Sequence, residues 1–306
     1  MTTKILVIID PQQQHQLGFD RAIELANIAD ISMHVVIFTD GRIQELPILG
    51  GDSADSITAG SNYVRKCQIW LEELVQPHID NGLAITTEVK AFRRLYDEVI
   101  RVATQQDVMF VFKPMRHHSL LKRTLYSSTD WNLIRTCPFP LLLVNDARPL
   151  KGRNIIAAVR FGEQDADHDN LNHIIMSQAV AVSKLYESRI HVVSAAPRSS
   201  NLGPNTPTKS CDQGMTDKSG QDCQSQAVEL AREFDVPEDR VTVMEGQAEV
   251  VVDKLAKQLD AGVVIVGTVA RSGLVGLFIG NTAERVLEEI STDILVLKQE
   301  DFTSPV

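Results

Sequence analysis

The sequence repeats itself once at an interval of about 150 residues, and this repeat limits the folds that the chain can adopt. Residues 4–10 (KILVIID) are matched by NIIAAVR at 154–160, an offset of 150. Three further runs recur in the same order: MHVV at 33–36 as IHVV at 190–193, DVMFVFK at 107–113 as AGVVIVG at 261–267, and PLLLVND at 140–146 as DILVLKQ at 293–299. Because both order and spacing are kept, we expect two domains of the same fold.

The repeated runs also indicate the secondary structure of these domains. Each run is mostly apolar without alternation, as in strands that are buried on both faces of a parallel sheet. Apolar residues with helical spacing lie between the runs, at 17–29 in the first half and at 171–185 in the second. Alternating strands and helices predict right-handed crossovers, so we expect two tandem, doubly wound, Rossmann-like α/β domains with about five strands each.

A polar stretch separates the two halves. It reads DARPLKG at 146–152, where Pro149 and Gly152 would break any helix. Such a stretch is typical of a linker between domains. We therefore expect the first domain to cover residues 1–147 and the second to cover residues 153–306.

Two other features of the repeat concern loops and edges. After its second strand each half has a segment without periodicity, at 40–60 and at 197–222, and we expect an irregular insertion in both places. The last apolar run of each half, at 140–145 and 293–298, would be an exposed sheet edge in an isolated domain. The sequence therefore predicts an intramolecular domain pairing, in which these two strands join the halves as a pseudo-dimer.

Charge and cysteine content exclude several classes of protein. The 30 Lys and Arg residues against 40 Asp and Glu give a net charge of −10, which opposes binding to nucleic acid or to anionic bilayers. No apolar stretch is long enough for a membrane span. The 4 cysteines show neither a disulfide framework nor a zinc pattern, and we expect a cytoplasmic protein.

A glycine-rich segment follows the fourth strand of the second half. It reads GTVARSGLVGLFIGNTAERVLEEI at 267–290, and its glycines precede Asn281-Thr282 and a helical pattern. Glycine lets backbone N–H groups approach an anion, and the N-terminus of a helix adds unpaired donors and partial positive charge. In an open α/β sheet, ligands bind outside the carboxyl ends of the strands where the strand order reverses. We therefore regard this segment as a candidate anion-binding site.

This segment resembles the nucleotide loop of the universal stress protein family, whose pattern is Gly, two residues, Gly, nine residues, Gly, then Ser or Thr. Gly267 and Gly280 hold the outer glycine positions with the correct interval of 13. Ala270 stands at the middle glycine position, and Asn281 stands at the hydroxyl position with Thr282 next to it. The form of the segment is similar to the tandem subgroup of this family. The resemblance implies two fused domains of the adenine nucleotide alpha hydrolase-like type.

The family's site residues carry over only in part. ATP-binding members place an aspartate at the end of the first strand, where this chain has Asp10 in the first half and Arg160 in the second. In the first half Lys113 and Arg116 stand at the first two glycine positions, and residues 127–129 stand near the terminal Gly-Ser-Thr position. Neither half matches the complete ATP motif, so the resemblance implies weak ATP binding or none.

The resemblance thus implies two sets of ligand-binding residues. In the second domain, the ligand- or phosphate-binding set is Gly267, Ala270, Gly273, Gly280, Asn281, Thr282 and Arg160. In the first domain, the secondary set is Asp10, Lys113, Arg116, Ser127, Ser128 and Thr129. We expect the second set to bind better, because the first carries bulky side chains in its loop. No metal site is expected.

Each of these residues also has a purely structural interpretation. Asn281 or Thr282 could simply cap the last helix, and Asp10 could cap the following helix at Gln12–Gln14. The basic residues around Lys113 and Arg116 could be the solvated face of a loop. The sequence does not decide between these interpretations and ligand binding.

The function predicted from these features is binding rather than catalysis. The chain contains no GxSxG, HExxH or GxxxxGK[ST] motif, so we predict no catalytic residues. The resemblance implies a non-catalytic stress-response protein that binds a small phosphorylated or other anionic ligand. ATP or another nucleotide-like molecule is an open alternative for this ligand. The sequence identifies no cofactor. Two other functions stay open, namely a ligand-free protein-interaction module and a weak ATPase. A homodimer is compatible with either.

Overall fold

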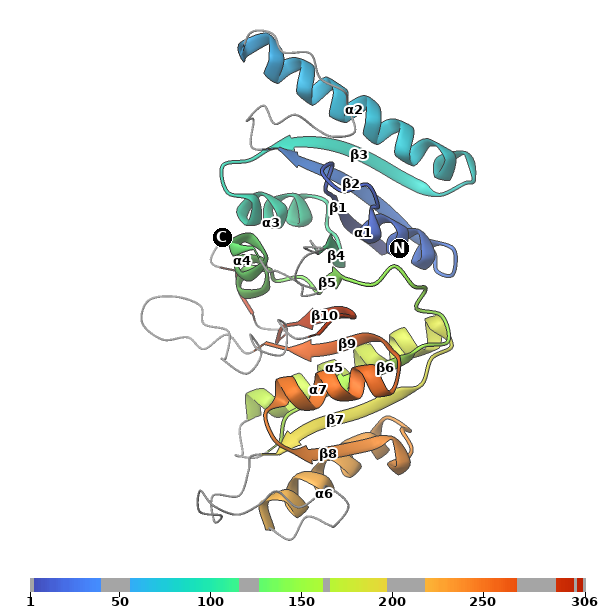
Figure 1. The fold of residues 1–306 in the computed structure, drawn as a ribbon, viewed down its shortest axis with the longest axis vertical. Coiled ribbons are helices and arrows are strands. Elements are labelled where there is room, and N and C mark those ends of the chain that lie inside the picture. Colours follow the sequence, from blue (N-terminus) through green and yellow to red (C-terminus); the bar gives the residue numbers. More distant parts are fainter. Residues whose placement is uncertain are drawn as a thin grey trace. The chain divides into compact units, whose positions relative to one another are not determined.

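The structure, a computed structural model, describes residues 3–39, 56–115, 127–161, 166–196, 218–268, 290–299 and 302–304 (Figure 1). The chain divides into two compact units, Met1–Pro149 with Phe302–Val306 and Leu150–Asp301. Each unit has its own parallel sheet and its own apolar core.

The first unit alternates strands and helices along the chain. Its sheet has the order β3-β2-β1-β4-β5, and every pair of neighbours is parallel. Helix α1 packs on β1 and β4, α2 packs on β3, and α3 packs against α4. The elements are β1 (Thr3–Ile9), α1 (Leu17–Ala26), β2 (Ile31–Thr39), α2 (Ser56–Asp80), β3 (Ala84–Ala91), α3 (Leu95–Gln105), β4 (Phe110–Pro114), α4 (Ser128–Thr136) and β5 (Leu141–Val144).

The second unit repeats this arrangement. Its sheet has the order β8-β7-β6-β9-β10, again with parallel neighbours. Helix α5 packs on β6 and β9, α6 on β8 and β7, and α7 on β7 and β9. The elements are β6 (Asn154–Ala158), α5 (Ala166–Tyr186), β7 (Ile190–Ala196), α6 (Lys218–Glu233), the 3-10 helix η1 (Glu238–Arg240), β8 (Val241–Glu245), α7 (Ala248–Gln258), β9 (Ala261–Gly267) and β10 (Asp293–Leu297).

The two sheets confirm the predicted fold of two tandem, doubly wound domains. Strands β1 to β5 correspond in order to β6 to β10, as the sequence repeat requires. The pairing of the two last strands stays a prediction, as do the expected domain boundaries at 147 and 153. Among the described residues, no helix combines the length and apolar character that a bilayer crossing requires.

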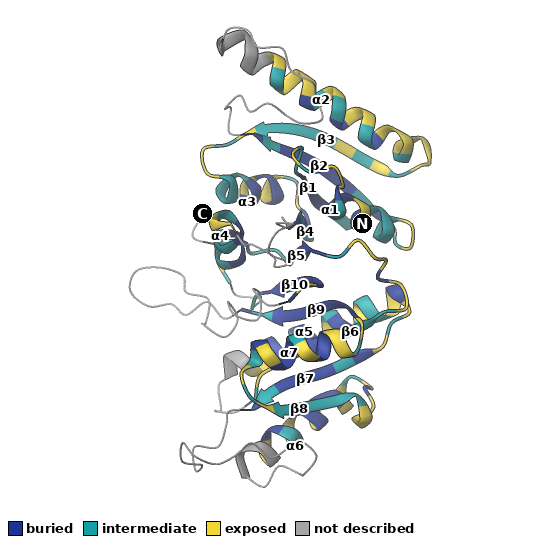
Figure 2. Ribbon diagram, viewed as in Figure 1, coloured by how far each residue is buried: buried dark blue, intermediate teal, exposed yellow. Residues whose placement is uncertain are grey.

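Burial follows the apolar runs (Figure 2). Several strands are buried along consecutive residues, including Ile5, Leu6 and Val7 in β1 and every residue of β10. Consecutive burial means that both faces of these strands are covered, which explains the lack of alternation in the sequence. The edge strands β3 and β8 are only partly buried.

The structure corrects the expected insertions. Helix α2 begins at Ser56 and α6 begins at Lys218, so residues 56–60 and 218–222 are helical where we expected irregular chain. Few apolar residues occur in these first helical turns, so they show no helical periodicity that the sequence could reveal. The remainder of both segments lies outside the described residues.

Strand β4 also begins later than its apolar run. The run starts at Asp107, whereas the strand starts at Phe110. Asp107 has a φ of 50°, in the left-handed region, and Val108 N donates to Ala103 O at 3.1 Å. These two features end helix α3 in the way that a C-terminal glycine usually does. Asp107 and Val108 therefore belong to the helix end rather than to the strand, and contact with β1 begins at Met109, whose N donates to Lys4 O at 2.8 Å.

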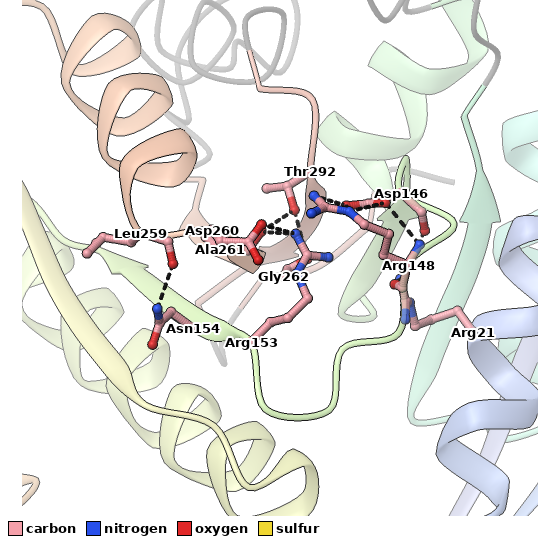
Figure 3. A network of polar contacts seen from close by, with 10 residues as sticks. All are labelled: Arg21, Asp146, Arg148, Arg153, Asn154, Leu259, Asp260, Ala261, Gly262 and Thr292. Atoms are coloured by element: carbon pink, nitrogen blue, oxygen red, sulfur yellow. Dashed lines mark hydrogen bonds and ion pairs between the residues drawn. The ribbon is translucent and has the colours of Figure 1, made fainter.

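The exit from the first unit is anchored by Arg21 of α1 (Figure 3). The Arg21 side chain is buried, and its Nη2 donates to Asp146 O at 3.0 Å and to Arg148 O at 2.8 Å. Its Nη1 pairs with the carboxylate of Glu24. Arg148 in turn pairs with Asp146, with Nη2 at 2.8 Å from Oδ2. The chain is therefore held to the first unit up to residue 148.

The entry into the second unit is anchored separately. Leu150 is buried, and Gly152 N donates to Tyr186 O at 2.9 Å. Arg153 Nη2 donates to Ala261 O at 2.8 Å and pairs with Asp260 at 3.3 Å (Figure 3). The chain is therefore held to the second unit from residue 150 onward.

The repeat has kept a histidine at the same place in both second strands, His34 in β2 and His191 in β7. His34 is buried, with Nδ1 at 2.8 Å from Thr86 Oγ1 and Nε2 at 3.3 Å from Glu88 Oε2. Burial lowers the pKa of His34, and the hydrogen bond to Glu88 compensates only in part. Burial also lowers the pKa of His191, with a further decrease from the charge of Arg240.

These lowered pKa values predict a loss of stability in mild acid. The unfolded chain takes up protons near the ordinary histidine pKa of 6.5, whereas the folded chain resists protonation at His34 and His191. The stability that the two neutral histidines contribute is thus present above pH 6.5 and is lost as the pH falls below 6.5. We expect the double variant His34→Gln/His191→Gln to flatten the decline of the unfolding free energy between about pH 7 and 5.5, measured in urea.

A histidine whose pKa shifts in the opposite direction provides the control for this experiment. The pKa of His173 is raised, first by its hydrogen bond to Asp169 O and also by the carboxylate of Glu233. His173 therefore stabilises the fold at low pH, and the variant His173→Gln should steepen the decline. An unchanged slope in the double variant would contradict the assignment of the acid loss to His34 and His191.

Candidate functional site

In each half, separately, equivalent residues lie at the carboxyl ends of the central strands. Strand β1 lies beside β4, and β6 lies beside β9, so the strand order reverses at these pairs. The chain leaves β1 at Asp10 and passes Lys113 in β4, and it leaves β6 toward Arg160 and β9 at Gly267. These are the places at which α/β proteins of this type bind ligands.

A buried amide side chain holds the backbone at the end of β1. Asp10 N donates to Gln16 Oε1 at 3.2 Å, and Gln16 Nε2 donates to Asp10 O at 2.8 Å. Gln16 is only 5% exposed. The amide therefore satisfies both backbone groups of Asp10 and fixes the position of this residue.

The second half has the same arrangement with a different amide. Arg160 N donates to Asn172 Oδ1 at 3.1 Å, and Asn172 Nδ2 donates to Arg160 O at 2.8 Å. Asn172 is 3% exposed, whereas Arg160 is exposed. Our sequence reasoning missed Gln16 and Asn172, since a polar residue next to or within a helix normally faces water.

The carboxylate of Asp10 makes local hydrogen bonds. Its Oδ1 accepts from Gln12 N at 3.1 Å and its Oδ2 accepts from Gln13 Nε2 at 3.2 Å. The Asp10 carboxylate therefore caps a turn. The helix that we expected at Gln12–Gln14 is wrong, because α1 starts only at Leu17. A role of Asp10 in ligand binding stays a prediction.

Lys113 forms an ion pair inside the first unit. Its Nζ lies 2.5 Å from Oδ1 of Asp130, a residue of α4, and also donates to Pro114 O at 3.2 Å. Ser127 is the N-cap of α4 and forms a capping box with Asp130, whereas Ser128 and Thr129 are the first residues of the helix. Arg116 lies outside the described residues. The Lys113 side chain is only 12% exposed, so it is not part of a solvated loop face.

Gly267 is required by the packing of the second unit. A Cβ atom at this position would lie 2.4 Å from Cγ and Cδ2 of Leu171, a buried residue of α5. In the first half a close contact between α1 and β4 has its glycine on the helix, since a Cβ at Gly18 of α1 would lie 3.1 Å from Pro114 Cδ at the end of β4. The remaining predicted residues of this loop lie outside the described residues: Ala270, Gly273, Gly280, Asn281 and Thr282.

A lysine that the sequence reasoning did not select lies beside the start of this loop. Lys298 directly follows β10, and its Nζ donates to Thr268 Oγ1 at 2.8 Å. Thr268 directly follows Gly267 and is buried. In the repeat, Lys298 corresponds to Asn145 of the first half. That comparison of charges between the halves was the signal that could have revealed Lys298.

The carboxyl edges of the two sheets therefore differ in charge. In the second half, Arg160 and Lys298 follow the strands on either side of β9, so both charges near Gly267 are positive. In the first half, Asp10 is negative and Lys113 is neutralised by Asp130. Among the residues that the structure describes, this difference in charge favours an anion at the edge of the second half. Within the described ranges, no group of three or more His, Cys, Asp or Glu residues is placed to hold a metal ion.

Comparisons with known proteins agree with the duplicated fold. The sequence model of the Universal stress protein family matches residues 1–145 and 166–298. The chain is similar to Universal stress protein E of Escherichia coli (strain K12), with 27% identity over 310 residues that cover 100% of this chain and 97% of the relative. One match in each half confirms the tandem arrangement that the sequence predicts.

Solved structures show the same similarity. A putative universal stress protein from Pseudomonas aeruginosa UCBPP-PA14 has 28% identity and a TM-score of 0.73, covering 98% of this chain and 94% of its own. A universal stress protein from Archaeoglobus fulgidus DSM 4304 has 13% identity and a TM-score of 0.67, covering 96% of this chain and 98% of its own. The second similarity concerns the fold alone.

Proposed function

The chain belongs to the universal stress protein family, and from this we propose that it is a non-catalytic stress-response protein that binds a small phosphorylated or nucleotide-derived ligand in its second half. The absence of a nucleophile or metal-ligand motif from the sequence supports binding without chemistry. We also propose a cytoplasmic location, supported by the buried residues Cys67, Cys137 and Cys223, which form no disulfide in the described part of the chain.

The charge of the second half's carboxyl edge is the observation that supports this function. Arg160 and Lys298 provide two positive charges at the strands flanking β9, and the glycine-rich segment starts at the end of β9. Asn172 holds the backbone of Arg160 in place, and Thr268 accepts a hydrogen bond from Lys298. An ammonium group held in this way, as that of Lys298 is, stabilises an anion more strongly than a mobile surface charge does.

A titration with inorganic diphosphate tests this proposal. We expect Lys298→Met to weaken diphosphate binding about tenfold or more, which is the value of one charge-assisted hydrogen bond. Isothermal titration calorimetry measures the effect. Lys151→Met is the matched control, because it removes the same charge from an exposed pair with Glu187 in the same unit and should leave binding unchanged.

The same titration separates the alternatives. ATP should bind no more tightly than diphosphate, because Arg160 replaces the carboxylate that ATP-binding relatives place near adenosine. Tight ATP binding with weak diphosphate binding would instead indicate an ATP-binding protein. No binding of either ligand would leave the protein-interaction module as the function.

A further inference from the structure

The N-terminus of α4 in the first unit holds a buried carboxylate. Asp130 is 3% exposed, and its Oδ2 accepts from Ser127 N at 2.6 Å and from Ser127 Oγ at 2.8 Å. Asp130 N donates to Ser127 Oγ at 3.2 Å. A negative charge at this position also interacts favourably with the partial positive charge of the helix end.

The counter-ion of this carboxylate comes from the neighbouring strand. Lys113 Nζ of β4 lies 2.5 Å from Oδ1 of Asp130, and the two side chains are only 12% and 5% exposed. Water therefore screens this pair little, and each charge needs the other. The carboxylate thus receives backbone, hydroxyl and ammonium contacts, which are the contacts that a bound phosphate would receive.

The position of the pair in the fold matches that of a ligand. Lys113 lies at the end of the strand that borders the switch in strand order, and α4 is the next helix of the described chain. We propose that Asp130 is a built-in anion, which occupies the helix end and the lysine of the first half and closes this half to phosphorylated ligands. This inference does not depend on ligand binding in the second half.

Competition between charges explains the closure. A phosphate that approached Lys113 would face the Asp130 carboxylate at close range, and like charges repel strongly where water is excluded. The phosphate would also have to replace three contacts that Asp130 makes within the chain. The first half should therefore bind phosphate only when Asp130 is removed.

Chemical rescue by inorganic phosphate in the full-length protein provides the test. Asp130→Ala should increase hydrogen exchange in residues 127–136, and phosphate should slow this exchange about tenfold by occupying the vacated position. Chloride at equal ionic strength should not slow this exchange. In the unaltered protein, phosphate should leave exchange in this segment unchanged. Exchange is measured peptide by peptide, so binding in the second half is recorded separately.

Two further variants keep the test decisive. Asp130→Asn keeps an acceptor for Ser127 N but removes the negative charge. It replaces the alanine variant in the test if that variant does not fold. Phosphate should slow hydrogen exchange less in this variant than in Asp130→Ala, but still measurably. Asp253→Ala breaks an exposed pair with Lys257 on α7 and should show no phosphate effect in that helix. If phosphate protects neither Asp130 variant, or protects residues 127–136 equally in the unaltered protein, the proposal is wrong.

Discussion

Replacement of Lys113 by methionine is expected to lower the free energy of unfolding by about 3 to 5 kcal/mol, because it leaves the buried Asp130 carboxylate without its counter-ion. The two charged atoms lie 2.5 Å apart and both side chains are largely buried. Urea denaturation followed by circular dichroism measures the loss. The expected effect is much larger than that of an ordinary surface lysine.

Two comparisons make this result specific. Lys257→Met breaks an exposed pair with Asp253 and should change stability by less than about 1 kcal/mol. The double variant Lys113→Met/Asp130→Leu removes both charges together and should recover most of the lost stability. A loss below 1 kcal/mol in Lys113→Met would show that the pair is hydrated in solution.

The second large effect is expected for Gly267→Val, which should destabilise the protein by about 3 kcal/mol through overpacking. The new Cβ would lie 2.4 Å from Leu171 Cγ, and Leu171 is a buried residue of α5. Since Gly267 also begins the glycine-rich segment, diphosphate binding should weaken in the same variant. Urea denaturation and calorimetry measure the two effects independently.

A double-mutant cycle identifies the cause. Leu171→Ala removes the atoms that a side chain at position 267 would meet, so Gly267→Val should cost less in that background than in the unaltered protein. In the first half, Gly18→Ala places a Cβ at 3.1 Å from Pro114 Cδ, a milder contact with a smaller expected loss. Strictly additive losses in the cycle would exclude a clash with Leu171.

The sequence predicts the strands of this fold well, because a strand that is buried on both faces leaves a continuous apolar run. Ile5, Leu6 and Val7 are such a run, and their equivalents in the second half are found by the repeat. The ends of elements are harder to predict. Asp107 was placed in a strand although its left-handed backbone ends a helix, and no apolar pattern records a backbone angle.

The candidate site was predictable to the extent that topology determines it. Because the strand order brings β1 to β4 and β6 to β9, Asp10, Lys113, Arg160 and Gly267 had to lie at strand ends near the switch. The partners of these residues were not predictable. Asn172 holds Arg160, and Asp130 pairs with Lys113, through side-chain directions that depend on how a helix is rotated on the sheet.

The anchored linker determines where the gene can be split. A fragment that ends at residue 147 would lose the Arg148 carbonyl that Arg21 binds, and one that begins at Arg153 would lose the buried Leu150 and the bond between Gly152 N and Tyr186 O. A cut between Pro149 and Leu150 keeps the contacts of Arg21 in the first half and those of Leu150 and Gly152 in the second half. Separate expression or reassembly of the two halves should therefore use this position within the linker, which leaves Phe302–Val306 of the first unit on the second fragment.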